Sequence, residues 1–336
     1  MCFLYAYLFT PAPEVTRAKG ENYDMIIDFN TPDKPVIIGL DHGYGNMKTA
    51  HACFQTGVTL HDKEPTFKSN LLFYDGQYYT IGEEHKEFTA DKMTDQDYFM
   101  LTLAGIASEL AFYGRQSADV QLAVGLPLTW VAEQKDDFKK YLMQHDPREE
   151  IAFTFKTREY RIRITSVDVF PQGFAAIVSH LSDFKGVNML CDIGNGTMNV
   201  MTITNGRPIS SKCFTEKYGT HQCTLLIRER LMQKFHVTIE DAVIEEILRT
   251  GTADIGKQYL DVIVEAAKEY TEGILRRLRE HEYHPDFMKL YIVGGGGCLV
   301  KNFAEYDAGR VTVNDDICAT AKGYEYMANA RMRKAG

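Results

Sequence analysis

Short apolar runs alternate along the chain with longer stretches in which apolar residues recur every three or four positions. Four short apolar runs predict buried strands, at residues 36–40, 120–124, 187–191 and 289–293, and the first of them is rich in β-branched residues. Apolar residues at helical spacing predict helices at about 95–113, 131–144, 174–181, 221–235, 239–249, 260–282 and 316–332. Strands that alternate with helices are typical of α/β layers.

Several further strands are expected to be antiparallel. Residues 70–74 and 77–81 are separated by Asp75-Gly76, and an Asp-Gly pair between two apolar runs is a strong hairpin signal. Segments at about 47–54 and 198–204 are predicted to be return strands after tight turns. Residues 151–169 are expected to form a further strand pair.

One pattern occurs twice. A buried strand ends in Asp41-His-Gly-Tyr-Gly, and another ends in Asp192-Ile-Gly-Asn-Gly, 151 residues later. Each is followed by a predicted return strand. A chance recurrence of so short a pattern is the alternative, but the matching flanks favour an internal duplication, and hence two domains that open in the same way.

Composition narrows the class of protein. The 336 residues are 45% hydrophobic, and 46 acidic against 37 basic residues give a net charge of -9, which argues against direct nucleic-acid binding. The sequence contains no run of eighteen or more apolar residues, so no membrane span is predicted. Residues 1–34 are predicted to be a tail, which lacks signal-peptide features, so a cytoplasmic protein is expected. Seven scattered cysteines without a CxxC pair are interpreted as buried thiols rather than zinc ligands.

The two acidic glycine turns are the first candidates for chemistry. Facing each other, they would form a phosphate clamp, because glycine lets backbone N–H groups approach phosphate oxygens. Asp41 and Asp192 could hold Mg²⁺ directly or through water, and Lys48 could reach a phosphate from the return strand. Each feature also has a structural explanation. The turns could be ordinary turns and Lys48 a solvated strand lysine. Thr197 offers a hydroxyl beside the phosphates, but this hydroxyl could equally cap the turn.

Two more segments could contribute to such a site. Gln172 lies where a strand meets a helix and could orient a water for attack on a γ-phosphate, although a turn role is the simpler interpretation. The run Gly294 to Gly297 suits close passage of backbone against a ligand. No Gly-Lys-Ser/Thr follows it, and residue 299 is Leu, so neither a P-loop nor a dinucleotide fingerprint is present.

Taken in order, these segments resemble the motifs of actin-like ATPases. IIGLDHGYGNMKTA looks like their first phosphate motif, LCDIGNGTMNVMTI like the second, YIVGGGGCLV like the adenosine motif, and VNDDICATAKGYEYMA like the closing helix. LAVGLPLTW, TLAGIASEL and VDVFPQGFAAI are similar to segments of the plasmid-segregating ParM/StbA group. The resemblance covers about residues 36–330.

The resemblance implies an actin-like (ribonuclease H-like) duplicated two-domain α/β fold with a nucleotide cleft between the domains. Domain I would be residues 36–170, completed by the C-terminal helix 316–336, and domain II residues 171–315. ATP and Mg²⁺ are the implied cofactors, with Asp41 and Asp192 near the metal and its waters, and Gln172 activating water. The implied phosphate contacts are Gly43, Tyr44, Gly45, Asn46, Lys48, Gly194, Asn195, Gly196 and Thr197. Gly294, Gly295, Gly296 and Gly297 would flank the adenosine.

The implied function is ATP-dependent polymerisation. In that family, ATP binding favours head-to-tail filaments, and hydrolysis destabilises them. The filament moves plasmids or other extrachromosomal DNA through a DNA-binding adaptor of ParR type, so the chain itself need bind neither DNA nor membrane.

Other interpretations stay open. A cell-shape or cytoskeletal bacterial actin is the nearest alternative. A small-molecule kinase of the same superfamily would need a catalytic base beyond the two motif aspartates, and none is evident. A chaperone ATPase would need a substrate-binding domain after the ATPase unit. A non-hydrolysing structural relative would be favoured by loss of Asp41 or Asp192, and both are present.

Overall fold

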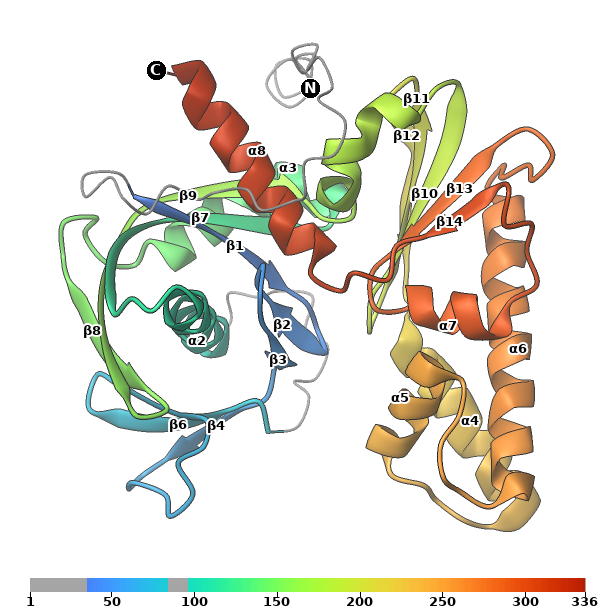
Figure 1. The fold of residues 1–336 in the computed structure, drawn as a ribbon, viewed down its shortest axis with the longest axis horizontal. Coiled ribbons are helices and arrows are strands. Elements are labelled where there is room, and N and C mark those ends of the chain that lie inside the picture. The colour runs from blue at the N-terminus through green and yellow to red at the C-terminus, as the bar shows by residue number, and fades with distance from the viewer. Residues whose placement is uncertain (1–34, 84–95, 336) are drawn as a thin grey trace.

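The protein has two lobes, each built on its own β-sheet (Figure 1). This computed structural model describes residues 35–83 and 96–335. The predicted N-terminal tail, residues 1–34, lies outside the described residues. In the described part of the chain, no helix has both the length and the apolar composition needed to cross a membrane.

The first lobe contains a nine-stranded sheet in the order β3-β2-β1-β7-β9-β8-β5-β6-β4. Its strands are β1 (Val36–His42), β2 (Asn46–Lys48), β3 (Cys53–Gln55), β4 (Val58–His61), β5 (Leu71–Tyr74), β6 (Gln77–Ile81), β7 (Ser117–Leu126), β8 (Ile151–Phe155) and β9 (Arg158–Pro171). β1 is buried along its whole length because β7 pairs beside it in parallel and helices cover both faces.

The sheet of the first lobe curls around helix α2 (Asp97–Phe112), which Figure 1 shows end-on inside it. Nearly every residue of α2 from Tyr98 to Leu110 is buried, as expected for a helix enclosed on all sides. Helix α3 (Leu128–Leu142) contributes Phe138 and Leu142 to the same core.

The opposite face of this sheet is covered by the C-terminal helix α8 (Ala319–Ala335). Ile37 of β1, Ala123 of β7 and Phe170 of β9 pack there against Tyr324 and Ala328 of α8. The 3₁₀ helix η1 (Phe174–Asp183), which follows β9, also contacts α8. The last helix in the sequence therefore lies on the first sheet.

The second lobe contains a five-stranded sheet in the order β12-β11-β10-β13-β14. Its elements are β10 (Val187–Ile193), β11 (Met198–Thr204), β12 (Arg207–Glu216), α4 (Thr220–Phe235), α5 (Asp241–Thr250), α6 (Lys257–Glu280), β13 (Lys289–Val293), α7 (Gly297–Phe303) and β14 (Val311–Val313). Helices α4 to α7 share one core cluster with the sheet, and η1 packs into another, which contains Leu190, Ile203 and Val293.

The two lobes repeat the same opening. β1 pairs antiparallel with β2 and parallel with β7, while β10 pairs antiparallel with β11 and parallel with β13. The duplication inferred from the sequence is therefore visible in the topology.

Some predicted elements were wrong. The return strand expected at 47–54 is two short strands, β2 and β3, because the chain turns again at residues 49–52. The segment after the second hairpin is not immediately helical: it first forms β12. The strands β4 and β14 and the helix α7 were not predicted.

Candidate functional site

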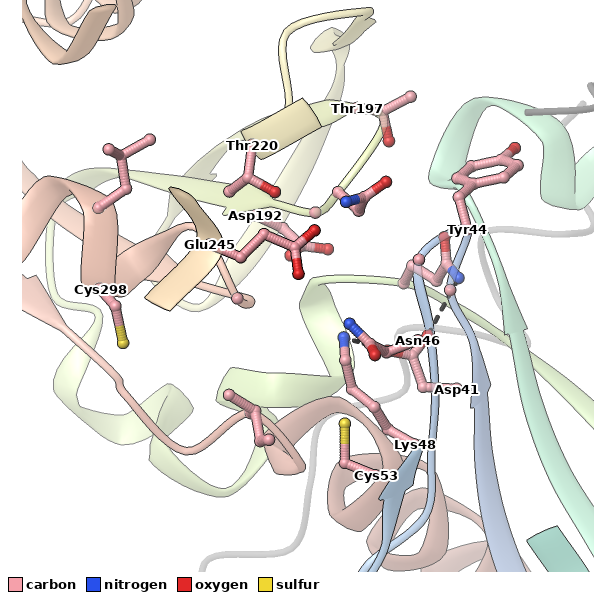
Figure 2. A pocket seen from close by; sticks show the side chains of 18 of the residues that line it. Asp41, Tyr44, Asn46, Lys48, Cys53, Asp192, Thr197, Thr220, Glu245 and Cys298 are labelled. Carbon is pink, nitrogen blue, oxygen red and sulfur yellow. Dashed lines mark hydrogen bonds and ion pairs between the residues drawn. The ribbon is translucent and has the colours of Figure 1, made fainter. Parts of the chain in front are cut away.

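A cavity of about 290 Å³ lies between the two lobes. Figure 2 shows side chains from both lobes pointing into it. Its walls are formed by Asp41, His42, Gly43, Tyr44, Gly45, Asn46, Lys48, Cys53, Gln172, Asp192, Gly194, Asn195, Thr197, Asn199, Thr220, Glu245, Leu248, Arg249, Gly295, Cys298, Leu299 and Ile317.

The first wall is the turn at residues 41–46, here called the first acidic loop, which joins β1 to β2. The register of this hairpin places Lys48 directly opposite Asp41, so the Lys48 Nζ lies 3.3 Å from the Asp41 Oδ2. The other carboxylate oxygen, Asp41 Oδ1, accepts a hydrogen bond of 3.2 Å from the Gln172 amide. Asp41 therefore fixes both the cation and the glutamine that the sequence singled out.

The second wall is the turn at residues 192–197, the second acidic loop, which joins β10 to β11. Asp192 is paired with Asn199 across this hairpin, and the turn is closed by a 2.8 Å hydrogen bond from the Gly194 N–H to the Thr197 carbonyl. The two loops meet at Gly45, where a Cβ would lie 2.7 Å from the Asn195 Cγ. Only glycine at position 45 allows this close approach of the lobes.

The charges in the cavity influence one another. Burial would lower the pKa of Lys48, but Asp41, Asp192 and Cys53 together outweigh it, and the pKa of Lys48 is raised. Burial and the Asp41 carboxylate raise the pKa of Asp192 to about 6, against the opposing effects of Lys48 and Asn199. Lys48 is therefore protonated at neutral pH and lies between two carboxylates, of which Asp192 has the raised pKa.

The four-glycine run passes close to the end of β10. A Cβ at Gly294, which has φ +85°, would lie 2.5 Å from the Asp192 Oδ1, and one at Gly296 would lie 2.3 Å from the Ile193 Cγ2. Of the four, only Gly295 lines the cavity, and Gly297 is the first residue of α7. These glycines let the chain pack against the second acidic loop.

Most of the residues singled out from the sequence are brought together. Those outside the cavity wall are Gly196, Gly294, Gly296 and Gly297. His42 lies at the wall but its Nε2 is 2.8 Å from the Thr102 hydroxyl. That hydroxyl donates to the Tyr98 carbonyl, so the His42 ring is held in the core of the first lobe.

Sequence reasoning missed one end of the cavity. Glu245, Leu248 and Arg249 reach it from α5, Cys298 and Leu299 from α7, and Ile317 from the segment before α8. Their only signal in the sequence is the spacing of Glu245, Leu248 and Arg249 on one face of a predicted helix. The thiol prediction was also only partly right, since Cys191 and Cys223 are buried but Cys53 is exposed and lines the cavity.

The carboxylates of the cavity suit a metal ion that keeps several water ligands better than one that is fully enclosed by protein ligands. Within residues 35–83 and 96–335, no group of three or more His, Cys, Asp or Glu side chains converges in a way that could hold a metal. Asp41 and Asp192 supply carboxylates from opposite lobes, which matches the way Mg²⁺ binds to few protein ligands, several waters and phosphate oxygens.

Two family models match the chain. Residues 39–174 match the N-terminal domain of actin-like proteins, and residues 190–305 match the C-terminal domain of the archaeal actin homologue described as MreB-like. The first range contains most of the first sheet, and the second range contains most of the second sheet. No curated protein matches the chain.

Solved structures of actin homologues have the same fold. The archaeal actin homologue Ta0583, in complex with ADP, is 20% identical with a TM-score of 0.66, over 87% of this chain and 99% of that one. The actin-like protein Alp7A is 15% identical with a TM-score of 0.70, over 89% and 97%. A 15-stranded ParM filament from Clostridium botulinum is 15% identical with a TM-score of 0.66, over 87% and 98%. The predicted actin-like two-domain fold is confirmed, while the ParM/StbA subgroup stays a prediction.

Proposed function

This chain is a member of the actin-like protein family, and we propose that it is an ATPase that binds ATP with Mg²⁺ in the cleft and polymerises into filaments. We further propose that the filaments partition plasmids or other extrachromosomal DNA through a DNA-binding adaptor of ParR type. A cytoskeletal role of the same filament is the nearest alternative.

The observation that carries the proposal is the meeting of the two acidic loops across one cavity. Each loop follows a buried strand and contains glycines that expose its backbone. Each loop also places one carboxylate in the cavity that Lys48 lines. A triphosphate bound there would contact both lobes, with Lys48 as a point charge for its oxygens and Mg²⁺ supplying charge neutralisation.

Gln172 is proposed to position the attacking water. Its amide N–H already donates to Asp41, which leaves its carbonyl oxygen able to accept a hydrogen bond from a water. Asp41 thereby orients the glutamine and does not need to act as a base itself. Asp192, on the opposite wall, is proposed to hold water of the metal shell.

The nucleoside is proposed to occupy the other end of the cavity. Leu248, Leu299 and Ile317 provide apolar surface for a planar base there, and Glu245 offers carboxylate oxygens that could accept from sugar hydroxyls. Arg249, one helical turn after Glu245, adds a donor. The glycine run contributes Gly295 to the same end.

The domain boundaries, the self-assembly and the adaptor are proposed on the family resemblance. Domain I would comprise residues 36–170 and the C-terminal helix, and domain II residues 171–315. Two similar structures are described as filaments, and a head-to-tail contact of a chain with its own copies produces an open polymer. The net charge of -9 agrees with a protein that reaches DNA through an adaptor in the cytoplasm.

Right-angle light scattering of the purified chain, with phosphate release followed in parallel, tests the proposal. After addition of ATP and Mg²⁺, scattering is expected to rise above a critical concentration, and phosphate release to follow it. Asp192→Ala should lose phosphate release because it removes one of the two carboxylates at the metal position.

Asp62→Ala is the matched control for phosphate release, since Asp62 is an exposed loop carboxylate outside the cavity. Steady phosphate release without scattering at any concentration would contradict polymerisation and point to a monomeric ATPase or a kinase. Absence of both nucleotide binding and phosphate release would contradict the ATPase itself.

A further inference from the structure

The second acidic loop rests on the first turn of helix α4. The Thr220 N–H donates to the Gly194 carbonyl at 3.0 Å, and the His221 N–H donates to the Asn195 carbonyl at 2.9 Å. The first N–H groups of a helix have no partner within the helix, so they are free to bind the loop. The position of α4 therefore decides the position of the loop.

Gly219, the residue before α4, is also fixed by close contacts and hydrogen bonds. A Cβ at Gly219 would lie 2.2 Å from the Asn195 carbonyl oxygen, so the backbone of Gly219 presses directly on the loop. Its N–H donates to the Gln222 Oε1 at 2.7 Å. Its carbonyl accepts a 2.8 Å hydrogen bond from the hydroxyl of Tyr270, which belongs to helix α6.

Tyr270 is itself fixed by packing. Its side chain is buried, and its ring stacks on Tyr218, with centroids 4.3 Å apart and planes inclined by 8°. The Arg277 guanidinium lies over the Tyr218 ring, 3.8 Å from its centroid, and its Nε donates to Glu216 at 3.1 Å. Tyr270 and Arg277, on one face of α6, thus contact residues 216–219, the segment that leads into α4.

We propose that Tyr270 is a positioning residue for the second acidic loop. Its hydroxyl holds Gly219, Gly219 and the first turn of α4 hold Gly194 and Asn195, and these residues lie in the cavity wall. This inference rests on the proposed function for its consequence, namely that Tyr270 sustains affinity for the phosphates without touching them.

Tyr270→Phe removes the one hydroxyl and keeps the ring stack, so it tests the proposal directly. In the nucleotide-free protein, hydrogen exchange at the Thr220 and His221 amides is expected to become about fivefold faster, the effect of one lost hydrogen bond. Tyr259→Phe is the matched control: Tyr259 lies on α6 three turns earlier and packs on Phe235, at the opposite end of α4 from Gly219. Unchanged exchange at both amides would overturn the proposal.

A second experiment measures the affinity for nucleotides by calorimetry. Tyr270→Phe should weaken binding of ATP with Mg²⁺ by about three- to tenfold and leave binding of adenosine unchanged, because only the phosphates depend on the loop. An equal loss for ATP and adenosine would indicate general damage and overturn the positioning role. A wild-type chain that binds no nucleotide would refute the proposed function, and the exchange experiment would still decide whether Tyr270 fixes the loop.

Discussion

Asp192 occupies a position that opposes its ionisation. It ends a buried strand, and the Asp41 carboxylate lies across the cavity, so its pKa is raised to about 6. Lys48 and Asn199 offset this effect only in part. A carboxylate kept in unfavourable surroundings is typical of a functional position, because stability alone would favour a neutral residue there.

Replacing Asp192 by asparagine is therefore expected to stabilise the nucleotide-free protein. With a folded-state pKa raised above the unfolded value, the favourable contribution of Asp192 is present below about pH 4 and is lost as the pH rises through 6. At pH 7.5, Asp192→Asn should raise the free energy of unfolding by about 1–3 kcal/mol. This gain should shrink toward zero near pH 4.

Urea unfolding at several pH values measures the effect of Asp192→Asn. Asp62→Asn, at an exposed loop position, provides the control and should show no such pH-dependent gain. A loss of stability at pH 7.5 in the Asp192 variant would contradict the electrostatic account. The same variant should bind ATP with Mg²⁺ more weakly than the wild type.

Single residues also show where the sequence was informative about the site. Asp41, Lys48 and Asp192 could be placed because they lie within a few positions of a strand end, where a hairpin determines which side chains face each other. Glu245 and Cys298 could not, because they reach the cavity from helices whose placement depends on the packing of the whole second lobe.

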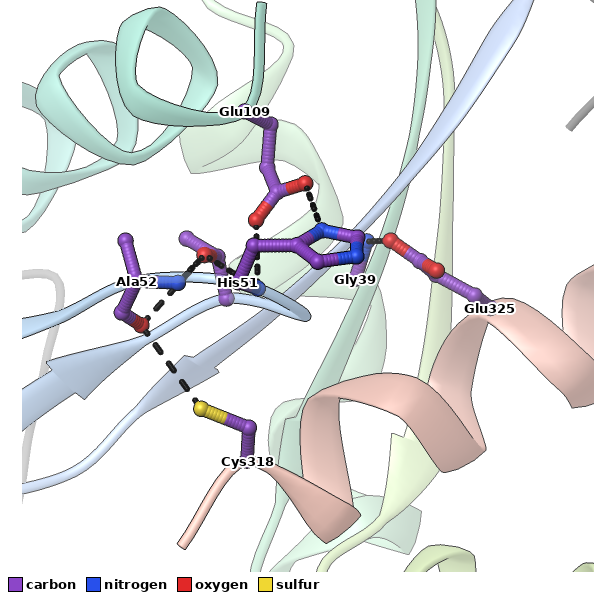
Figure 3. A network of polar contacts seen from close by, with 7 residues as sticks. Gly39, His51, Ala52, Glu109, Cys318 and Glu325 are labelled. Carbon is purple, nitrogen blue, oxygen red and sulfur yellow. Dashed lines mark hydrogen bonds and ion pairs between the residues drawn. The ribbon is translucent and has the colours of Figure 1, made fainter. Parts of the chain in front are cut away.

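Among the secondary-structure elements, helix α8 is tied to strand β1 by a buried carboxyl. The Glu325 Oε1 accepts a 2.9 Å hydrogen bond from the Gly39 N–H (Figure 3). Glycine is needed at 39, because a Cβ would lie 2.1 Å from the Ala321 carbonyl oxygen. Burial raises the pKa of Glu325 to about 8; the Gly39 N–H and Lys322 lower it, and Glu109 raises it further.

The Glu325 carboxyl should make the α8–β1 contact sensitive to pH. Its stabilising contribution is present below about pH 4.5 and is lost as the pH rises through 8, because the folded state must then ionise a buried group. Glu325→Gln keeps an acceptor for Gly39 without the charge, so it should exceed the wild type in stability by at least about 1 kcal/mol at pH 8.5.

Thermal unfolding of Glu325→Gln, Glu325→Ala and wild type between pH 5 and 9 tests this contact. Glu325→Ala should be less stable than Glu325→Gln at every pH, since it leaves the buried Gly39 N–H unpaired. Parallel pH profiles for wild type and Glu325→Gln would contradict the account. The neighbouring His51–Glu109 pair, at 2.8 Å, is present in all three proteins.

The elements that the sequence did not predict share a physical cause. β12 carries exposed polar residues such as Ser210, Ser211 and Lys212 along much of its length, so no alternation marks it as a strand. β14 has three residues and exists because β13 pairs beside it. By contrast, Asp75 and Gly76 have φ of +50° and +74°, the conformation expected of an Asp-Gly hairpin turn.

At the scale of the whole molecule, the chain passes twice between the two sheets, from β9 to η1 and from β14 to α8. Gly173, in the first passage, has φ +71°, and a Cβ there would lie 3.0 Å from the Asp192 Cβ. Each lobe has its own large core cluster. A ligand in the cavity is therefore placed to couple two bodies that each have a core of their own and that also meet where η1 packs on α8.

A ligand that bridges the lobes must stabilise both of them, because its binding free energy is lost when either lobe opens. ATP with Mg²⁺ should therefore slow hydrogen exchange in the first acidic loop and the second together. Lys48→Met lies on one lobe only, yet it should reduce protection in both loops, since it weakens the binding on which both depend. Adenosine, which lacks phosphates, should protect residues 245–249 and 297–299 and leave the first acidic loop unchanged. Protection by ATP of one loop alone would mean that the nucleotide binds a single lobe, which would contradict a triphosphate held between the two acidic loops.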